Sequence, residues 1–153
     1  MASQNEKTTL FGETKQDYAS VLRWMSFVNC DVYDCLGGWF LPLIGRRPYN
    51  RESVEESKVA VEKRLRMMED QLSKTRYLVG EELTLADLFS VGMLAGGFQC
   101  FFDKTWRNEH PFLTKWVDLV YHSQIYQDVV PGKLELIETA IPNIPLKNST
   151  FKT

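Results

Sequence analysis

The sequence predicts an all-α protein, a bundle of about five or six helices. Apolar residues recur at steps of three and four along most of the chain, which is the spacing of one helix face. No run of useful length alternates apolar and polar residues as a half-buried strand would. With 153 residues and a net charge of −2, the chain is long enough to bury the core of one domain. It carries no basic surplus that would indicate direct binding of nucleic acid.

The first helix is predicted from about Tyr18 to Leu36. Its apolar face consists of Tyr18, Val21, Leu22, Met25, Val28, Val32 and Leu36. Gly37-Gly38 follows directly, and because glycine weakens a helix we expect the pair to end or bend it.

The second helix is predicted to begin between Asn50 and Ser53. Ser53 opens an S-x-x-E capping box, and Asn50 is a competing N-cap. The buried stripe that follows is Val54, Val61, Leu65, Met68 and Leu72. The opposite face carries charges of both signs, which is typical of a solvent-exposed face.

The third helix has the clearest start signal in the chain. Thr84 suits the N-cap, and Asp87 lies at the third helical position, where its carboxylate can reach the backbone N–H of the cap. Leu83 and Leu88 flank this capping box at the spacing of a hydrophobic staple. Because the cap accounts for the position of Asp87, we favour a structural role for this carboxylate over general acid–base chemistry.

The residues behind this cap are apolar nearly all round, which indicates a helix at the centre of the bundle. Gly92, Gly96 and Gly97 each lower helix stability, by up to about 1 kcal/mol relative to alanine. Close approach of a neighbouring helix is the expected compensation.

Two further helices are predicted near the C-terminus. Pro111 suits the first turn of one, with a short helix over 123–128 after it. The apolar face of the longer one is Leu113, Trp116, Val117, Val120 and Tyr121. We therefore expect a helical domain over residues 14–141, between an N-terminal segment 1–13 and an extended C-terminal tail 142–153.

Motifs for catalysis, metal binding and phosphate binding are absent from the sequence. The odd number of cysteines, Cys30, Cys35 and Cys100, fits neither a disulfide framework nor a zinc site, and indicates free thiols. The N-terminus does not have the pattern of a secretory signal, and the longest apolar stretch, 35–45, is too short to span a bilayer. We expect a cytoplasmic protein that binds neither membranes nor metals.

Two motifs resemble a known family. The T-L-A-D sequence of residues 84–87 and the W-M-S-F sequence of residues 24–27 are similar to the C-terminal helical domain of glutathione transferases. Longer stretches, residues 23–29, 42–49, 77–89 and 97–107, look like the gamma subunit of translation elongation factor 1 in its fungal form. The resemblance runs from about Thr14 to Val129.

This resemblance implies a mostly architectural function. The gamma subunit is a non-catalytic module of the guanine-nucleotide-exchange complex of elongation factor 1, in which it docks the exchange subunit. One alternative is the helical half of a glutathione transferase, which conjugates glutathione to electrophiles once a thioredoxin-like half is present. Another is a transferase-like appendage of a different translation protein, such as an aminoacyl-tRNA synthetase.

The resemblance also implies where a ligand would lie. In transferases the thioredoxin-like half supplies most glutathione contacts, and nothing before Thr14 resembles it, so we expect a fragment that binds no cofactor alone. Bacterial relatives carry a His-Lys pair late in the first helix, where this chain has Tyr33-Asp34. A wall for glutathione or the second substrate would involve Trp24, Asn29 and Tyr33, although we favour ordinary packing for all three. Apolar surface left uncovered by a missing half could produce a homodimer.

Overall fold

The computed structural model describes residues 8–145, and within this range the regular structure is helical apart from one isolated bridge between Tyr77 and Gly80. The segments are α1 (Lys15–Phe27), the π-helical η2 (Val28–Val32), α2 (Tyr33–Leu43), α3 (Arg51–Leu72), α4 (Leu85–Cys100), α5 (Lys104–Glu109), α6 (Pro111–Tyr121) and α7 (Gln124–Gln127). Since α1, η2 and α2 form one continuous helix, the described residues contain six helices. The all-α prediction is confirmed.

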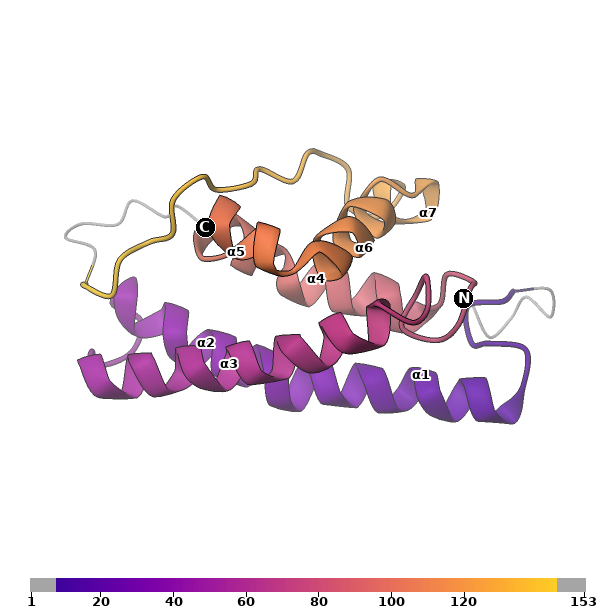
Figure 1. Ribbon diagram of the computed structural model, residues 1–153, viewed down its shortest axis with the longest axis horizontal. Helices are drawn as coiled ribbons and strands as arrows, with labels where there is room; N and C mark the ends of the chain where they lie inside the picture. The colour runs from indigo at the N-terminus through magenta and orange to yellow at the C-terminus, as the bar shows by residue number, and fades with distance from the viewer. Residues whose placement is uncertain (1–7, 146–153) are drawn as a thin grey trace.

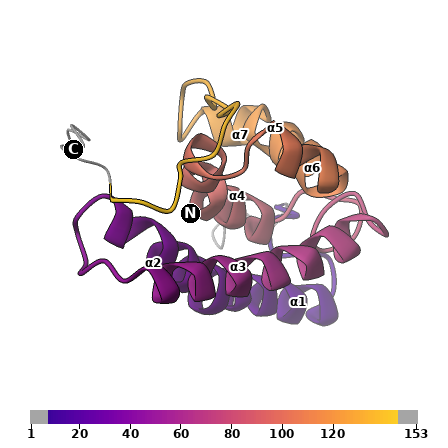
Figure 2. The same cartoon turned by 60° about the vertical axis from the view of Figure 1, so that its left-hand side comes forward.

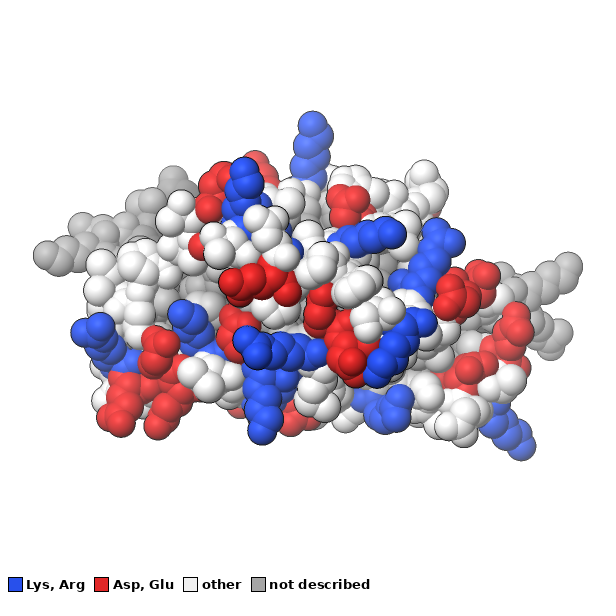
Figure 3. All heavy atoms as spheres, viewed as in Figure 1, with Lys and Arg blue, Asp and Glu red and all other residues white. Residues whose placement is uncertain are grey.

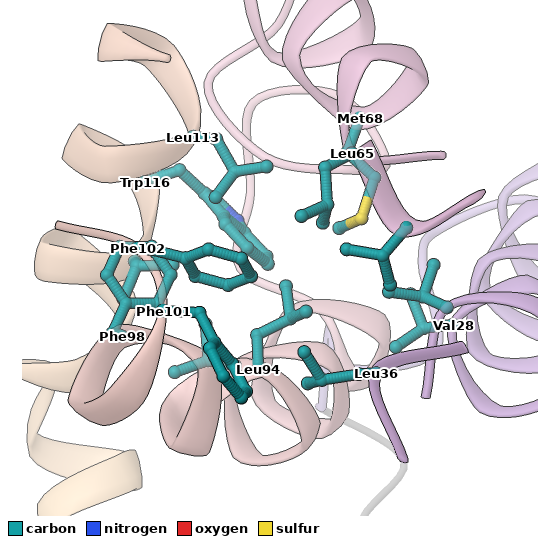
Figure 4. Close-up of a cluster of buried hydrophobic side chains, with 14 of the residues drawn as sticks. Val28, Leu36, Leu65, Met68, Leu94, Phe98, Phe101, Phe102, Leu113 and Trp116 are labelled. Carbon is teal, nitrogen blue, oxygen red and sulfur yellow. The ribbon is translucent and has the colours of Figure 1, made fainter. Parts of the chain in front are cut away.

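The helices form two layers with α4 between them (Figures 1 and 2). The bent helix α1–η2–α2 and α3 make one layer, and α5, α6 and α7 lie on the other side of α4. Figure 4 shows side chains from both layers meeting in one core. Its labelled members are Val28, Leu36, Leu65, Met68, Leu94, Phe98, Phe101, Phe102, Leu113 and Trp116. The prediction of α4 as the central helix therefore agrees with its position.

The first helix does not end at the glycine pair. It bends earlier, over Val28–Val32, where one π-helical stretch changes its direction. Helix α2 then passes through Gly37 and Gly38 to Leu43. At Gly38 an added Cβ would lie 2.6 Å from Ser57 Oγ, so the missing side chain lets α3 approach closely.

The N-caps follow mostly from local sequence. Asn50, rather than Ser53, caps α3: its side-chain oxygen accepts a hydrogen bond from the Ser53 N–H at 2.9 Å. Pro111 occupies the first turn of α6 as predicted. Thr14 and Asp17 form a capping box at the start of α1 that uses the same T-x-x-D pattern as residues 84–87, although we did not predict it.

The glycines of α4 have two different environments. At Gly97 an added Cβ would clash with the ring of Phe102, which follows the C-terminal end of α4 itself, so this close neighbour is not another helix. At Gly96 an added Cβ would have no atom within 4 Å, and at Gly92 only the Tyr126 hydroxyl at 3.8 Å. For these two the expectation of close helix packing is wrong within residues 8–145.

An extended strap, residues 133–145, follows α7 and crosses the C-terminal end of α4 (Figure 1). The N–H groups of Ile137 and Ile141 donate to the carbonyls of Phe98 and Cys100, at 3.1 and 3.0 Å. Asn143 at its end accepts a hydrogen bond from the Tyr49 hydroxyl. Of the predicted tail, 142–153, residues 142–145 contain neither helix nor strand and turn at Ile144, whose N–H donates to the Pro142 carbonyl at 2.8 Å, and residues 146–153 lie outside the described range.

Among the described helices none is long and apolar enough to cross a membrane.

Candidate functional site

An open pocket of about 410 Å³ lies between α2 and α4. Its walls combine apolar side chains, three helix glycines and a few polar groups at the rim. The lining residues are Tyr33, Asp34, Leu36, Gly37, Phe40, Leu41, Arg47, Gly92, Met93, Gly96, Gln99, Cys100 and Phe101. Its volume is within the range of small-molecule sites, about 300–1,000 Å³, and its lining has the apolar character of such sites.

The α4 wall of the pocket is unusually bare for a central helix. Gly92, Gly96 and Gln99 are exposed, one helical turn after another, while the residues on the opposite side of α4 are buried. A central helix is expected to be covered on all sides. The pocket is therefore the place where the described residues leave α4 open.

Three residues were predicted to form a ligand wall, and the structure places one of them at this pocket. Tyr33 stands at the rim with half of its surface exposed. Trp24 is packed in the core, where its indole N–H has no hydrogen-bond partner among the described residues. Asn29 lies on the exposed surface with its amide 3.8 Å from Cys30 Sγ. Neither of these two lines the pocket.

The polar groups of the pocket lie mainly at its edge. Tyr33 and Asp34 come from the start of α2, and Arg47 comes from the loop after it, so both charge signs are present. Cys100 is buried deeper, and burial raises the pKa of its thiol. The thiol is therefore held in its protonated, less nucleophilic form. We identified neither the glycines nor Cys100 as site residues from the sequence, because they carry no motif.

The carboxylate of Asp87 is fully buried and acts as a structural acceptor. Its Oδ2 accepts from the Thr84 N–H and hydroxyl at 2.9 and 2.7 Å, within the capping box of α4. Its Oδ1 accepts from the Leu78 N–H and the Trp116 indole N–H, both at 2.9 Å. This carboxylate therefore joins the turn before α4 to helix α6, with every contact explained by folding.

The staple predicted around this cap stays a prediction. Leu83 and Leu88 are both partly buried against the core. That burial agrees with a staple without establishing contact between the two side chains.

Outside the pocket, the charged groups of residues 8–145 are mixed in sign on the face that Figure 3 shows. Figure 3 shows Lys and Arg interspersed with Asp and Glu over the face seen there. Within residues 8–145 no group of three or more His, Cys, Asp or Glu side chains is placed to hold a metal ion. The pocket between α2 and α4 is thus the strongest candidate for ligand binding.

Comparison with known proteins identifies the family. The model of the glutathione S-transferase C-terminal domain matches residues 32–124, more than half of the chain. The chain belongs to this family. The matched range begins just before Tyr33 and includes every residue of the pocket.

Relatives of two kinds are found. The protein named glutathione S-transferase stcT in Emericella nidulans is 43% identical over 96% of this chain and 68% of its own length. A putative elongation factor 1 gamma homolog of Saccharomyces cerevisiae is 38% identical over 71% of this chain and 49% of its own length. The resemblance to the gamma subunit is therefore real, but it does not separate that subunit from the fungal transferases.

The solved structures agree with this result. The glutathione-transferase-like domain of elongation factor 1-gamma from Saccharomyces cerevisiae superposes with a TM-score of 0.79 at 30% identity, over 92% of this chain and 63% of that one. The chain spans 54–68% of the length of the first three curated relatives it matches.

Proposed function

We propose that the chain is the helical half of a glutathione transferase, and that the pocket between α2 and α4 is one wall of its site for the electrophile. The pocket carries this proposal: it is open, mainly apolar, and has the half-exposed phenol of Tyr33 at its rim. Two relatives named glutathione S-transferases support it, at 43% identity over 96% of this chain and at 37% over 95%.

The chemistry assigned to the pocket is binding and orientation. An apolar electrophile gains affinity by leaving water for the side chains of Leu36, Phe40 and Met93. The Tyr33 hydroxyl can donate one hydrogen bond to a polar group of the electrophile, which fixes its orientation. Glutathione contacts are assigned to no residue of this chain.

The test is conjugation of glutathione to 1-chloro-2,4-dinitrobenzene by the whole gene product. We expect a rate above the uncatalysed background. Tyr33→Phe should lower kcat/KM by about tenfold, the value of one hydrogen bond of roughly 1.4 kcal/mol. Tyr18→Phe is a matched control, because Tyr18 is 48% exposed on the same bent helix and does not line the pocket. A background rate for the wild type would refute the proposal.

A second candidate function is the one first expected: docking of the exchange subunit of elongation factor 1. The TM-score of 0.79 to the yeast gamma-subunit domain favours it. Calorimetric titration of the chain with the N-terminal region of the exchange subunit tests it, and a saturable heat with a 1:1 ratio is expected. Absence of binding by the folded chain, together with conjugation by the whole product, would refute the docking function and support the transferase. Homodimerisation and the cytoplasmic location stay predictions.

A further inference from the structure

Among the described residues, nothing packs closely enough against Gly92 and Gly96 of α4 to require glycine there. Gly92 and Gly96 lie one helical turn apart, and both line the pocket between α2 and α4. Glycine in a helix interior is destabilising relative to alanine because it fixes more backbone freedom on folding. Gly97, in the same helix, is explained by the ring of Phe102, but no comparable neighbour is found for the other two.

Both glycines line the pocket, and Gly96 faces open space, whereas the atom nearest a Cβ on Gly92 belongs to Tyr126 of α7. A Cβ on Gly96 would have no atom within 4 Å, and a Cβ on Gly92 would be in ordinary contact with the Tyr126 hydroxyl at 3.8 Å. On the facing helix, a Cβ on Gly37 would meet only Leu41 Cδ1, also at 3.8 Å. Alanine would therefore fit at all three positions, and its cost would be the loss of pocket volume.

The missing side chains also determine the shape of the walls. Two glycines one turn apart leave α4 backbone exposed at the pocket, and Gly37 lines the opposite side from α2. The aromatic rings of Phe40 and Phe101 lie at an edge-to-face angle of 80° at the same pocket, with centroids 5.7 Å apart. A flat aromatic molecule can contact both the bare backbone and these rings, which prefer offset-stacked or edge-to-face partners.

We propose that Gly92 and Gly96 determine the specificity of this pocket for flat electrophiles with several fused rings. The inference rests on the proposed transferase function and names the substrate class of the same site. A methyl or larger group at either position would project into the space such a ligand needs. Small single-ring electrophiles would still fit beside it.

The test measures binding of three soluble aromatic acids, benzoate, 2-naphthoate and 2-anthroate, to the 153-residue chain by calorimetric titration. We expect affinity to rise with ring number, with 2-anthroate bound at least tenfold more tightly than benzoate. Gly96→Leu should weaken 2-anthroate at least tenfold and change benzoate less than threefold. Lys63→Leu is the control, since it adds the same side chain on the exposed face of α3.

Thermal unfolding separates a filled pocket from a damaged fold. Gly96→Leu should melt at or above the temperature of the wild type, because a glycine leaves the helix. If that variant does not fold, Gly96→Ala makes the same comparison with an expected two- to fivefold loss for 2-anthroate.

The outcomes also separate this inference from the transferase proposal. Equal affinity of wild type and the Gly96 variants for 2-anthroate would overturn the role of the glycines, and so would a wild type without preference for ring number. Neither result would change the outcome expected in the conjugation assay. Conversely, a pocket that selects by ring number in a protein without conjugation activity would refute the transferase and retain the pocket as a binding site.

Discussion

The buried carboxylate of Asp87 should dominate the stability of the domain. It is fully buried and accepts four hydrogen bonds: two from Thr84, one from the Leu78 N–H and one from the Trp116 indole. Asp87→Ala leaves three N–H donors without an acceptor, since the Thr84 hydroxyl can turn to another partner. Each stranded donor costs about 1–3 kcal/mol. We expect a loss of about 3–6 kcal/mol, because water can enter the vacated space and satisfy part of them.

A second variant separates one hydrogen bond from the whole set. Trp116→Phe keeps an aromatic ring in the core, removes the indole donor to Asp87 Oδ1 and leaves a small cavity where the larger ring was buried. A hydrogen bond to a charged group is worth about 1.5–3 kcal/mol, and with the cavity added we expect a loss at the upper end of that range. Urea unfolding followed by far-ultraviolet circular dichroism gives the free energy of unfolding for each variant.

The α1 capping box provides the matched control. Asp17 accepts from the Thr14 N–H and hydroxyl at 3.0 and 2.8 Å, the same geometry on an exposed surface. These hydrogen bonds lower the pKa of Asp17, and the one from the Thr14 side chain has the largest effect. Its contribution is therefore complete above the ordinary carboxyl pKa and is lost as the pH falls through the lowered value. At neutral pH Asp17→Ala should cost a small part of what Asp87→Ala costs, and equal losses would refute the argument from burial.

Two further predictions concern other parts of the fold. Gly97→Ala should destabilise the domain by about 1–3 kcal/mol through overpacking against Phe102, whereas Gly96→Ala should stabilise it by up to about 1 kcal/mol. Calorimetric melting temperatures check both variants. A change of the same sign in both would contradict the contact between Gly97 and Phe102. Iodoacetamide should alkylate the exposed Cys30 well before the buried Cys100, whose raised pKa keeps its thiol protonated. Mass spectrometry of tryptic peptides gives the order in which the two cysteines react. Equal rates of alkylation would contradict the burial of Cys100.

Most of the fold follows from short-range patterns in the sequence. The apolar stripe of α3, the T-x-x-D start of α4 and Pro111 at the start of α6 each depend on residues within one or two helical turns. The course of the first helix does not: Gly37-Gly38 permits the helix to end, and it continues to Leu43 where Gly38 lies close to Ser57 of α3, a residue distant in the sequence. Its π-helical stretch has no local marker in the sequence.

The candidate site was predicted less well for a related reason. Tyr33 was found through a family resemblance, which carries information about distant contacts. The pocket itself depends on which side chains are missing from the face of α4. The sequence shows a glycine such as Gly96 in the same way whether an aromatic ring or open space lies in front of it. Only the positions of α2 and α4 in space distinguish the two cases.

The strap after α7 also bears on how the domain forms and opens. The hydrogen bond between Tyr49 and Asn143 closes a loop of 94 residues, whereas the capping boxes join residues three apart. Contacts so distant in sequence are slow to form, and an extended segment with few buried side chains opens at low free energy. The strap should therefore dock after the helices have assembled. In native-state hydrogen exchange, the Ile137 and Ile141 amides should lose protection while α4 remains closed.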